Sequence, residues 1–475
     1  MPNILALLAL LCWPFVSLIL YWRCSALTAT FWTIFGAYMF LPQKVEFVLP
    51  LIPNIEKENI AAYCTLIGCL AVRRIRFRLL SGARAAKVVV LLGLMVPTFT
   101  VLTNLDPVFT GVQVKQALSP KDTLSMTLQF VFTLVPFVLA ALLVKDFKDG
   151  VKILRLLAIA GLIYSPLMLI EVLLSPQLHT WIYGFFPHAF DQQIRFGGYR
   201  PVVFMGHGLI VANFTVAVLI AITALFKIRQ KILFIPNVIY LFYGFFLLLV
   251  CKSVGAWLLG FLGLTLLVFF PSRLSMLIAF ILACTVFLYP VLAIFDYIPR
   301  ESLLDLAETF GSDRAASLEF RFNHEEIMLA HGKDKLLFGW GGWDRNRIDG
   351  AVTDGYWIII FTQFGLLGYL VYFGLPMLAV MNGKKEGARS RSPLEKQVSA
   401  AFCVLIAMLM IDQIPNASQH SWVFFLYGAA TGLFASKREA AFSKGGSHAK
   451  KHRKHQSISH ISGEQVSREY GWIEK

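Results

Sequence analysis

The sequence contains little charge, and several kinds of functional motif are missing from it. Only 15% of its 475 residues are charged and 57% are hydrophobic, so a soluble fold of this length could not bury that much apolar surface. The chain has no Walker loop, no Gly-x-Ser-x-Gly, no His-Glu-x-x-His, no dinucleotide fingerprint and no Asp-x-Asp pair. These absences argue against chemistry with ATP or nucleotide sugars.

Neither cysteines nor histidines are spaced as a metal site or a disulfide framework. The seven cysteines lie in or beside apolar segments, where we expect them to be small apolar filler. His324 and His331 are seven residues apart with no cysteine nearby, which is a weak zinc pattern. The C-terminal histidines His448, His452 and His455 could hold a metal, but we favour a solvated tail. We expect no bound metal and no cofactor.

Long apolar runs dominate what the chain does contain. A bilayer core of about 30 Å needs about 20 apolar residues to cross it as a helix, and the sequence offers about thirteen such runs. We therefore predict an all-α, polytopic membrane protein with one membrane domain over 1–437. The first run has no basic region before it and no small-residue cleavage site, so we interpret it as a retained span. The predicted spans are 4–21, 27–42, 58–72, 87–104, 123–144, 151–172, 201–225, 233–251, 254–271, 275–296, 355–380, 398–413 and 420–436.

The charged loops predict an orientation in the membrane. Basic residues cluster after the third, seventh and eleventh spans and again in the tail, 438–475, and short basic loops stay in the cytoplasm. Thirteen spans place all four clusters inside if the N-terminus is outside and the C-terminus is a disordered cytoplasmic tail. The net charge of +15 is then mostly a topology signal, helped by anionic membrane lipids, and indicates no nucleic-acid partner. The predicted outer segments are 43–57, 105–122, 173–200 and 298–354.

The largest outer segment, 298–354, is a polar stretch with internal order. Residues 316–331 contain good helix formers and neither Gly nor Pro, which predicts an amphipathic helix. Arg321 and Glu325 are four residues apart and could pair on its surface. This helix could simply lie on the membrane surface, or it could also aim Arg321 and His324 at a lipid headgroup.

Ionisable residues at the predicted outer ends of several spans indicate a polar vestibule. Charges inside spans are costly and usually line a cavity or pair with one another. A channel would carry them through its full depth, whereas here they gather at one end. Each side chain alone could be snorkelling to the interface, but for the group we favour a site. The residues are Glu171, Arg195, Arg200, His207, Lys252, Asp354 and Asp412.

Three motifs follow one another in this outer region. Residues 200–208 read Arg-Pro-Val-Val-Phe-Met-Gly-His-Gly at the mouth of the seventh span. Arg321 is followed by Leu-Phe-Gly-Trp-Gly at 337–341, where a glycine turn could let the backbone approach a headgroup or be a plain loop turn. Asp354 opens the eleventh span and precedes Gly-Leu-Leu-Gly at 365–368. In order and spacing these motifs resemble the bacterial O-antigen ligase and polymerase superfamily (Wzy and WaaL types).

The chain departs from the family pattern at two positions. Where the family often has Ser-Arg-Gly after the eighth span, this chain has Lys252-Ser-Val-Gly, so the role of that arginine falls to Lys252 or is lost. Where ligases have histidine at the start of the third motif, this chain has Asp354. The second departure favours a polymerase, or another glycan-transferring branch of the superfamily, over a ligase.

The resemblance implies glycosyl transfer at the outer face of a bacterial plasma membrane. The donor would be a glycan on undecaprenyl diphosphate and the acceptor a sugar hydroxyl, with a chain-length regulator and a flippase as possible partners. A ligase that moves glycan to lipid A-core or protein, a lipid-linked glycan flippase and a non-catalytic scaffold remain alternatives. We expect arginines to bind the diphosphate and a carboxylate or imidazole to act as base. The assigned residues are Arg200 and Arg321 with Arg195 and Lys252 in support for the diphosphate, Asp354 or His324 as base, and His207 as positioning group.

Overall fold

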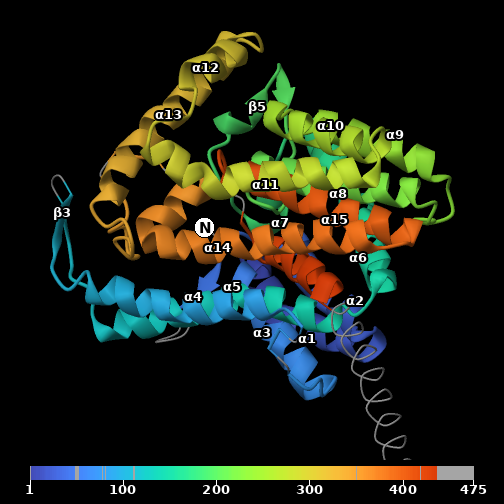
Figure 1. Cartoon of the computed structure of the whole chain (residues 1–475), viewed down its shortest axis with the longest axis horizontal. Helices are drawn as coiled ribbons and strands as arrows, with labels where there is room; N and C mark the ends of the chain where they lie inside the picture. Colours follow the sequence, from blue (N-terminus) through green and yellow to red (C-terminus); the bar gives the residue numbers. More distant parts are fainter. Residues whose placement is uncertain are drawn as a thin grey trace, which may run out of the picture.

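The described chain is built almost entirely of helices, as predicted (Figure 1). A computed structural model describes residues 2–48, 53–77, 79–80, 82–110, 113–348, 350–352, 354–417 and 419–435, so the predicted tail over 438–475 lies outside the described residues. The helices related to the predicted spans are α1 (Ile4–Arg23), α2 (Ala26–Phe40), α3 (Lys57–Ile67) with a π-helix over Gly68–Val72, α4 (Arg84–Leu102), α5 (Pro120–Leu143), α6 (Phe147–Leu174), α8 (Gly208–Lys227), α9 (Asn237–Val250), α10 (Val254–Val268), α11 (Ser272–Ile294), α14 (Tyr356–Arg389), α15 (Pro393–Asp412) and a last helix over Ser421–Ala435.

Eight of the described helices are long and apolar enough to cross a membrane. They are α1, α4, α5, α6, α8, α11, α14 and α15. Four shorter apolar helices accompany them, namely α2, α9, α10 and Ser421–Ala435. The chain is therefore an all-α protein with the helices of a membrane protein. The prediction of thirteen spans stays a prediction, because length and composition select only the eight longer helices as spans.

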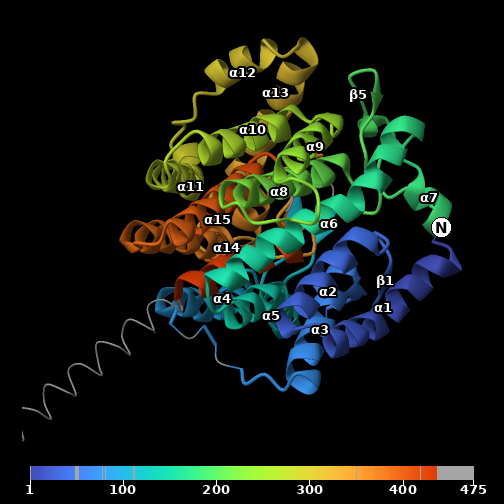
Figure 2. The same ribbon diagram turned by 90° about the vertical axis from the view of Figure 1, so that its right-hand side faces the viewer.

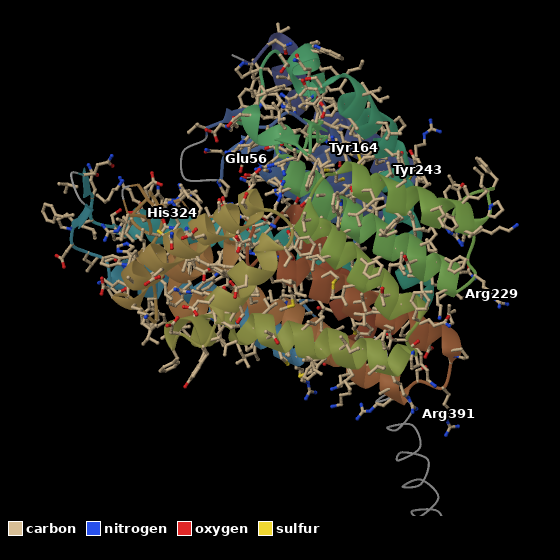
Figure 3. All side chains as sticks on the ribbon, turned by 90° about the horizontal axis from the view of Figure 1, so that it is seen from above. Glu56, Tyr164, Arg229, Tyr243, His324 and Arg391 are labelled. Atoms are coloured by element: carbon tan, nitrogen blue, oxygen red, sulfur yellow. The ribbon has the colours of Figure 1, made fainter. Side chains whose placement is uncertain are left out.

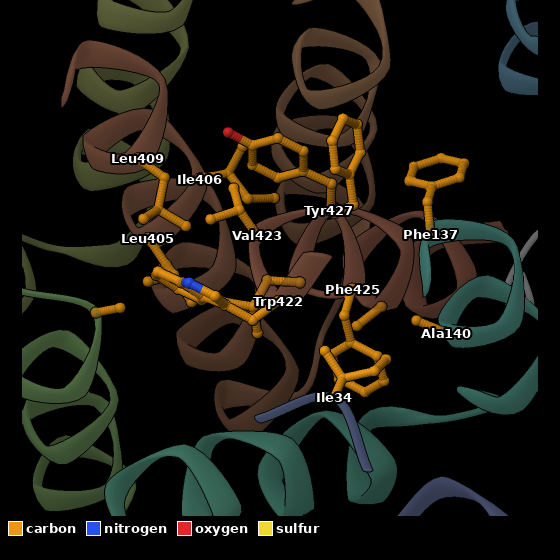
Figure 4. Packing of buried hydrophobic residues seen from close by; sticks show 14 of the residues in the cluster. Ile34, Phe137, Ala140, Leu405, Ile406, Leu409, Trp422, Val423, Phe425 and Tyr427 are labelled. Carbon is orange, nitrogen blue, oxygen red and sulfur yellow. The ribbon is translucent and has the colours of Figure 1, made fainter. Parts of the chain in front are cut away.

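The core lies around α8, whose apolar residues surround the whole helix axis. A helix that is apolar on every side is suited to a buried position, and nearly all of α8 is buried between α6, α9, α10 and α15. The helix over Ser421–Ala435 is equally buried, and Trp422 and Phe425 from it pack against Leu405 of α15 and Ile34 of α2 (Figure 4). These helices form the scaffold that carries the polar end.

Two polar helices lie over one end of the bundle, where the large polar loop was predicted (Figure 1). They are α12 (Arg300–Glu308) and α13 (Ser312–Lys333), and Figure 2 shows them on the side away from α1 to α3. Arg229 and Arg391 of the basic loops lie at the opposite end from His324 of α13 (Figure 3). The polar loop and these basic residues are thus at different ends of the bundle.

Three small hairpins were not predicted. They pair β1 (Glu46–Phe47) with β2 (Ile55–Glu56), β3 (Val108–Thr110) with β4 (Gln113–Lys115), and β5 (Ile194–Arg195) with β6 (Gly198–Tyr199), all antiparallel. Each one lies in a segment that we had predicted to be outside. Strands of two or three residues are too short to produce a periodic sequence pattern.

Helix α14 is interrupted where the glycine turn of the second motif packs against it. At Gly365 the backbone has φ +66°, and the chain around Gly339 runs alongside the break. The amides of Trp340 and Gly341 donate to the carbonyls of Thr362 and Gln363 at 2.8 and 2.9 Å. A side chain at either glycine would collide with backbone of the other segment. The turn therefore joins α13 to α14.

Candidate active site

A cavity of about 710 Å³ lies beneath α13 at the polar end of the molecule. Six of the seven predicted site residues line it, although they come from four separate parts of the sequence. They are Arg195, Arg200, His207, Lys252, Arg321 and Asp354. His324 is the predicted residue that is not among those lining the cavity. Of the seven ionisable residues from which we predicted a vestibule, five line this cavity, whereas Glu171 and Asp412 do not.

The segment that carries Arg200 and His207 is a turn, not the start of a helix. We predicted the seventh span from residue 201, but α8 begins at Gly208. Buried Glu171 of α6 holds the turn, because its Oε2 accepts from the amides of Val202 and Val203, both at 2.7 Å. The φ of +48° at Val203 is incompatible with a right-handed helical turn here. An apolar sequence alone could not reveal this tether.

Further buried side chains fix the same turn. The hydroxyl of Tyr164 accepts from the amide of Phe204 at 3.0 Å, and Lys57 donates to the carbonyl of Phe204 at 2.6 Å. Gln43 donates to the carbonyl of Met205 at 3.0 Å. Polar groups with several buried partners have little freedom to move. The two cavity residues at the ends of the turn are therefore held on a rigid support.

His207 caps α8 and is neutral at pH 7. Its Nδ1 accepts from the amide of Leu209 at 3.1 Å, which leaves the proton of the neutral ring on Nε2, 3.3 Å from Oε1 of Gln192. Burial, followed by repulsion from Arg200, lowers the pKa of His207 to about 3. A histidine with so low a pKa is a weak base. It is suited to hydrogen bonding within the cavity.

Arg200 is buried and aimed by its own surroundings. Its Nε donates to Oε1 of Gln193 at 3.1 Å, and its side chain packs on Gly208, where a Cβ would lie 2.6 Å from the arginine Cδ. Burial and repulsion from other arginines lower the pKa of Arg200 to about 10, which leaves it protonated at pH 7. The repelling side chains are Arg195, Arg314 and Arg321.

Arg321 and Asp354 form an ion pair across the cavity wall. The arginine Nε lies 3.2 Å from Oδ2 of Asp354, and the two side chains are 28% and 40% exposed. The sequence spacing would have allowed Arg321 to pair with Glu325 on the same helix, but in the structure Arg321 pairs with Asp354. Glu325 instead accepts from the hydroxyl of Tyr289 at 3.1 Å and the indole of Trp357 at 3.0 Å. Those bonds tie α13 to α11 and α14 and leave Arg321 free to face Asp354.

The remaining histidines of the loop have local structural contacts. His324 accepts at Nδ1 from the amide of Val352 at 3.2 Å and lies against the ring of Phe320. His331 stacks on Trp340 with 4.5 Å between ring centroids, and its Nε2 lies 3.0 Å from the carbonyl oxygen of Arg345. The glycine turn at 339–342 does not contribute to the cavity lining. Of the two interpretations of that turn, the structure supports the plain loop turn.

The sequence interpretation missed several polar residues of the cavity. The most important is Arg314, which lies seven residues before Arg321 on α13 and therefore near the same helical face. The seven-residue spacing could have been used to predict from the sequence that Arg314 lies beside Arg321. His188 and Asn416 also line the cavity, and the ring of His188 lies 4.6 Å from that of His207. Their positions depend on loop folding, for which we found no sequence signal.

The charges that line the cavity are strongly unbalanced. Five cations face one carboxylate among the described lining residues, which gives a net charge of +4 with the histidines neutral. In the described part of the chain, only Arg321 of the five has an ion-pair partner. Such a cavity is built to bind anions. Among the described residues no three His, Cys, Asp or Glu side chains meet as a metal-binding group.

Models of known protein families and the sequences of curated proteins give no match to this chain. The chemistry of the cavity is therefore the basis for inferring a function.

Proposed function

We propose that the protein is a glycan polymerase of the O-antigen or exopolysaccharide type. It transfers a glycan from undecaprenyl diphosphate to a sugar hydroxyl at the outer face of a bacterial plasma membrane. The observation that carries this proposal is the meeting of five cations and one carboxylate in a cavity of about 710 Å³ at one end of an apolar helix bundle. A lipid-linked diphosphate would have its headgroup at that depth and its tail among the helices.

Arg200 and Arg321 stabilise the leaving group in this mechanism. When the bond between the anomeric carbon and the diphosphate oxygen breaks, its electron pair stays on the diphosphate. Arginine is always charged at neutral pH and binds phosphate oxygens with two parallel N–H groups. A bound diphosphate would relieve the repulsion among the arginines of the cavity. These cations supply the charge stabilisation without requiring a metal.

Asp354 acts as the general base. It is the only carboxylate among the described residues of the cavity, and it is partly exposed so that an acceptor can reach it. The acceptor hydroxyl gives its proton to Asp354 while its oxygen forms the new bond to the anomeric carbon. Arg321 orients the carboxylate through the 3.2 Å ion pair. His207, neutral and fixed at the start of α8, positions the substrate.

Single substitutions of Arg200→Gln, Arg321→Gln and Asp354→Asn test the proposal in cells that make the glycan. Each should reduce extension by roughly 100-fold or more, because one stabilising group of a transition state is lost. Arg347→Gln is the matched control, since Arg347 lies in the same outer loop but does not line the cavity. Glycan chain lengths are read from a gel ladder with membrane insertion checked in parallel. Normal chains from all three inserted variants would refute the assignment.

A ligase is the nearest alternative, because the same cations would serve the same leaving group. The two differ in what accumulates when activity is lost. A missing polymerase leaves single repeat units on the final acceptor, whereas a missing ligase leaves finished polymer on the lipid carrier. Asp354 in place of the ligase histidine favours the polymerase.

A flippase or transporter for lipid-linked glycans is the alternative from another class. Such a protein needs polar groups near the middle of the membrane and commonly has inverted repeats. The cavity described above lies at one end of the bundle, which favours transfer over transport. Movement of the lipid without formation of a glycosidic bond would identify a flippase.

A further inference from the structure

The cations of the cavity exceed what one lipid diphosphate can neutralise. A diphosphate esterified at both ends carries two negative charges. The described lining residues have a net charge of +4, so two positive charges remain after that headgroup binds. Uncompensated charges in a partly desolvated site repel one another, as the lowered pKa of Arg200 indicates. The surplus suggests that the substrate carries more negative charge than its diphosphate.

The surplus cations gather around the β5–β6 hairpin. Arg195 is on β5, and the ammonium of Lys252 lies so close to Gly198 on β6 that a Cβ at that position would collide with it. The guanidinium of Arg314, from α13, lies 4.7 Å from the ring centroid of Phe196 at the hairpin tip. These three cations therefore come from three separate elements and converge on one hairpin.

The hairpin is held in place by aromatic packing. Phe196 has φ +50° and stacks on Trp257 of α10 with 5.5 Å between centroids and 15° between planes. The Phe196 ring thus contacts both Trp257 of α10 and Arg314 of α13. These contacts join the hairpin to α10 and α13 at the edge of the cavity. This arrangement holds the guanidinium of Arg314 and the backbone of the hairpin that carries Arg195 before any ligand binds, which reduces the ordering cost of binding.

None of the three has an ion-pair partner in the described ranges of the chain. The Nε of Arg195 is buried and has no hydrogen-bond partner among the described residues. Arg200 and Arg321, by contrast, are close to His207 and Asp354, where the proposed transfer takes place. The cavity thus has two arginines beside His207 and Asp354, and three further cations at the β5–β6 hairpin.

We propose that Arg195, Lys252 and Arg314 form a second anion subsite that binds an acidic group of the glycan itself. This inference rests on the proposed function for the identity of the substrate. A sugar carboxylate and a sugar phosphate share the chemistry that the subsite recognises, and either would restore charge balance. The protein therefore handles an acidic repeat unit, with the diphosphate at Arg200 and Arg321 and the acidic sugar at the hairpin.

Binding measurements on the full chain in lipid nanodiscs test the subsite. The ligands are the lipid diphosphate without glycan, the same lipid with a neutral oligosaccharide, and the same lipid with a uronate or a phosphorylated sugar in that oligosaccharide. The free uronate oligosaccharide is a fifth ligand. The wild type should bind at least one acidic lipid-linked ligand about tenfold more tightly than the neutral one, as expected for one charged hydrogen-bonded contact. The acidic ligand that binds more tightly than the neutral one identifies the acidic group.

The variants separate the two anion sites. The double variant Arg195→Gln, Arg314→Gln should lose the acidic preference, because its affinity for the acidic lipid-linked ligands should fall about tenfold more than its affinity for the lipid diphosphate without glycan. Lys252→Gln should show a smaller loss of the acidic preference. This variant replaces the double variant in the test if the double variant does not fold. Arg347→Gln should bind all ligands as the wild type does.

Two results would overturn the subsite. One is equal binding of neutral and acidic ligands by the wild type, and the other is equal weakening of every diphosphate ligand in the hairpin variants. If the lipid diphosphate does not bind but the free uronate oligosaccharide does, the proposed function fails and the subsite stands.

Discussion

At the scale of single residues, Asp354 and Arg321 form the centre of the site. Their 3.2 Å contact orients the only carboxylate among the described cavity residues, and the same arginine faces the proposed leaving group. Replacing Asp354 by Asn keeps the shape and the hydrogen bond but removes the base. Its effect therefore separates proton transfer from positioning.

A first prediction concerns the ionic pair. Arg321→Lys should retain a cation near Asp354 but lose the planar guanidinium group that can donate to two oxygens at once. We expect transfer to fall about 10-fold or more, less than in Arg321→Gln. Initial rates with purified lipid-linked repeat units check this. Equal rates for Arg321→Lys and wild type would mean that charge alone is sufficient.

A second prediction follows from the low pKa of His207. Because its folded pKa of about 3 lies below the ordinary value of 6.5, the unfolded chain binds the proton first. The contribution of His207 to stability is full above about pH 6.5 and is lost as the pH falls toward 3. His207→Gln, whose side chain cannot titrate, should lose less thermal stability than wild type between pH 7 and pH 4. Parallel melting curves of the two proteins in detergent measure the difference, and identical pH slopes would contradict the prediction.

At the scale of elements, the site depends on tethers between segments far apart in the sequence. Glu171 of α6 holds the turn that carries Arg200, and Glu325 holds α13 against α11 and α14. The break in α14 at Gly365 is matched to the glycine turn at Gly339. The cavity walls are thus set by buried polar contacts and by close backbone packing.

Glu171→Gln provides a third prediction. Three backbone N–H groups now donate to the Glu171 carboxylate. The side chain of glutamine cannot accept from all three, because its nitrogen is itself a donor. The donor KM should rise by about 10-fold or more, with a smaller change in kcat, since Arg200 is displaced while Asp354 is not. Glu326→Gln, at an exposed position outside the cavity, is the control. An unchanged KM in a folded Glu171→Gln protein would show that the turn keeps its position without the carboxylate.

The backbone contact between the two glycines gives a fourth prediction. A Cβ at Gly339 would lie 2.5 Å from backbone atoms of Gln363 and Phe364, and φ +68° disfavours any other residue. Gly339→Ala should lower stability by about 2 kcal/mol or more. Gly255→Ala, which has open space around it, should change stability little. Thermal unfolding in detergent compares the two, and equal midpoints would contradict the packing argument.

Sequence patterns predicted the helices well and the cavity residues in large part. Apolar runs require helices in a membrane, and ionisable residues at their ends identified most of the cavity lining. The start of α8 was wrong by several residues because Glu171 overrides the helical tendency of an apolar stretch. Arg321 does not take the pairing with Glu325 that its spacing allowed, because Glu325 has partners on other helices. Contacts between distant segments were the information that the sequence did not contain.

At the scale of the whole molecule, polar and basic regions lie at opposite ends of an apolar bundle. His324 lies at one end and Arg229 and Arg391 at the other (Figure 3). This separation fits the orientation that we propose, with the cavity outside and the basic loops in the cytoplasm. In the orientation that we propose, the cavity would lie where a lipid carrier presents its headgroup.

Cysteine labelling gives a fifth prediction, for orientation. Leu306→Cys, on the exposed face of α12, should react with a membrane-impermeant maleimide in intact cells, whereas Arg391→Cys should react only after the membrane is opened. The unsubstituted chain, with its seven cysteines, provides the background. The reverse pattern would invert the topology and move the cavity to the cytoplasm.

The central claim is that the cavity around Arg321 and Asp354 forms glycosidic bonds. Its most direct test is reconstitution of the purified chain in liposomes with lipid-linked repeat units as the only substrate. The account predicts a ladder of longer lipid-linked glycans, with one lipid diphosphate released for each bond formed, and no ladder with Asp354→Asn. A full ladder from Asp354→Asn, or lipid movement without any new bond from the wild type, would contradict it.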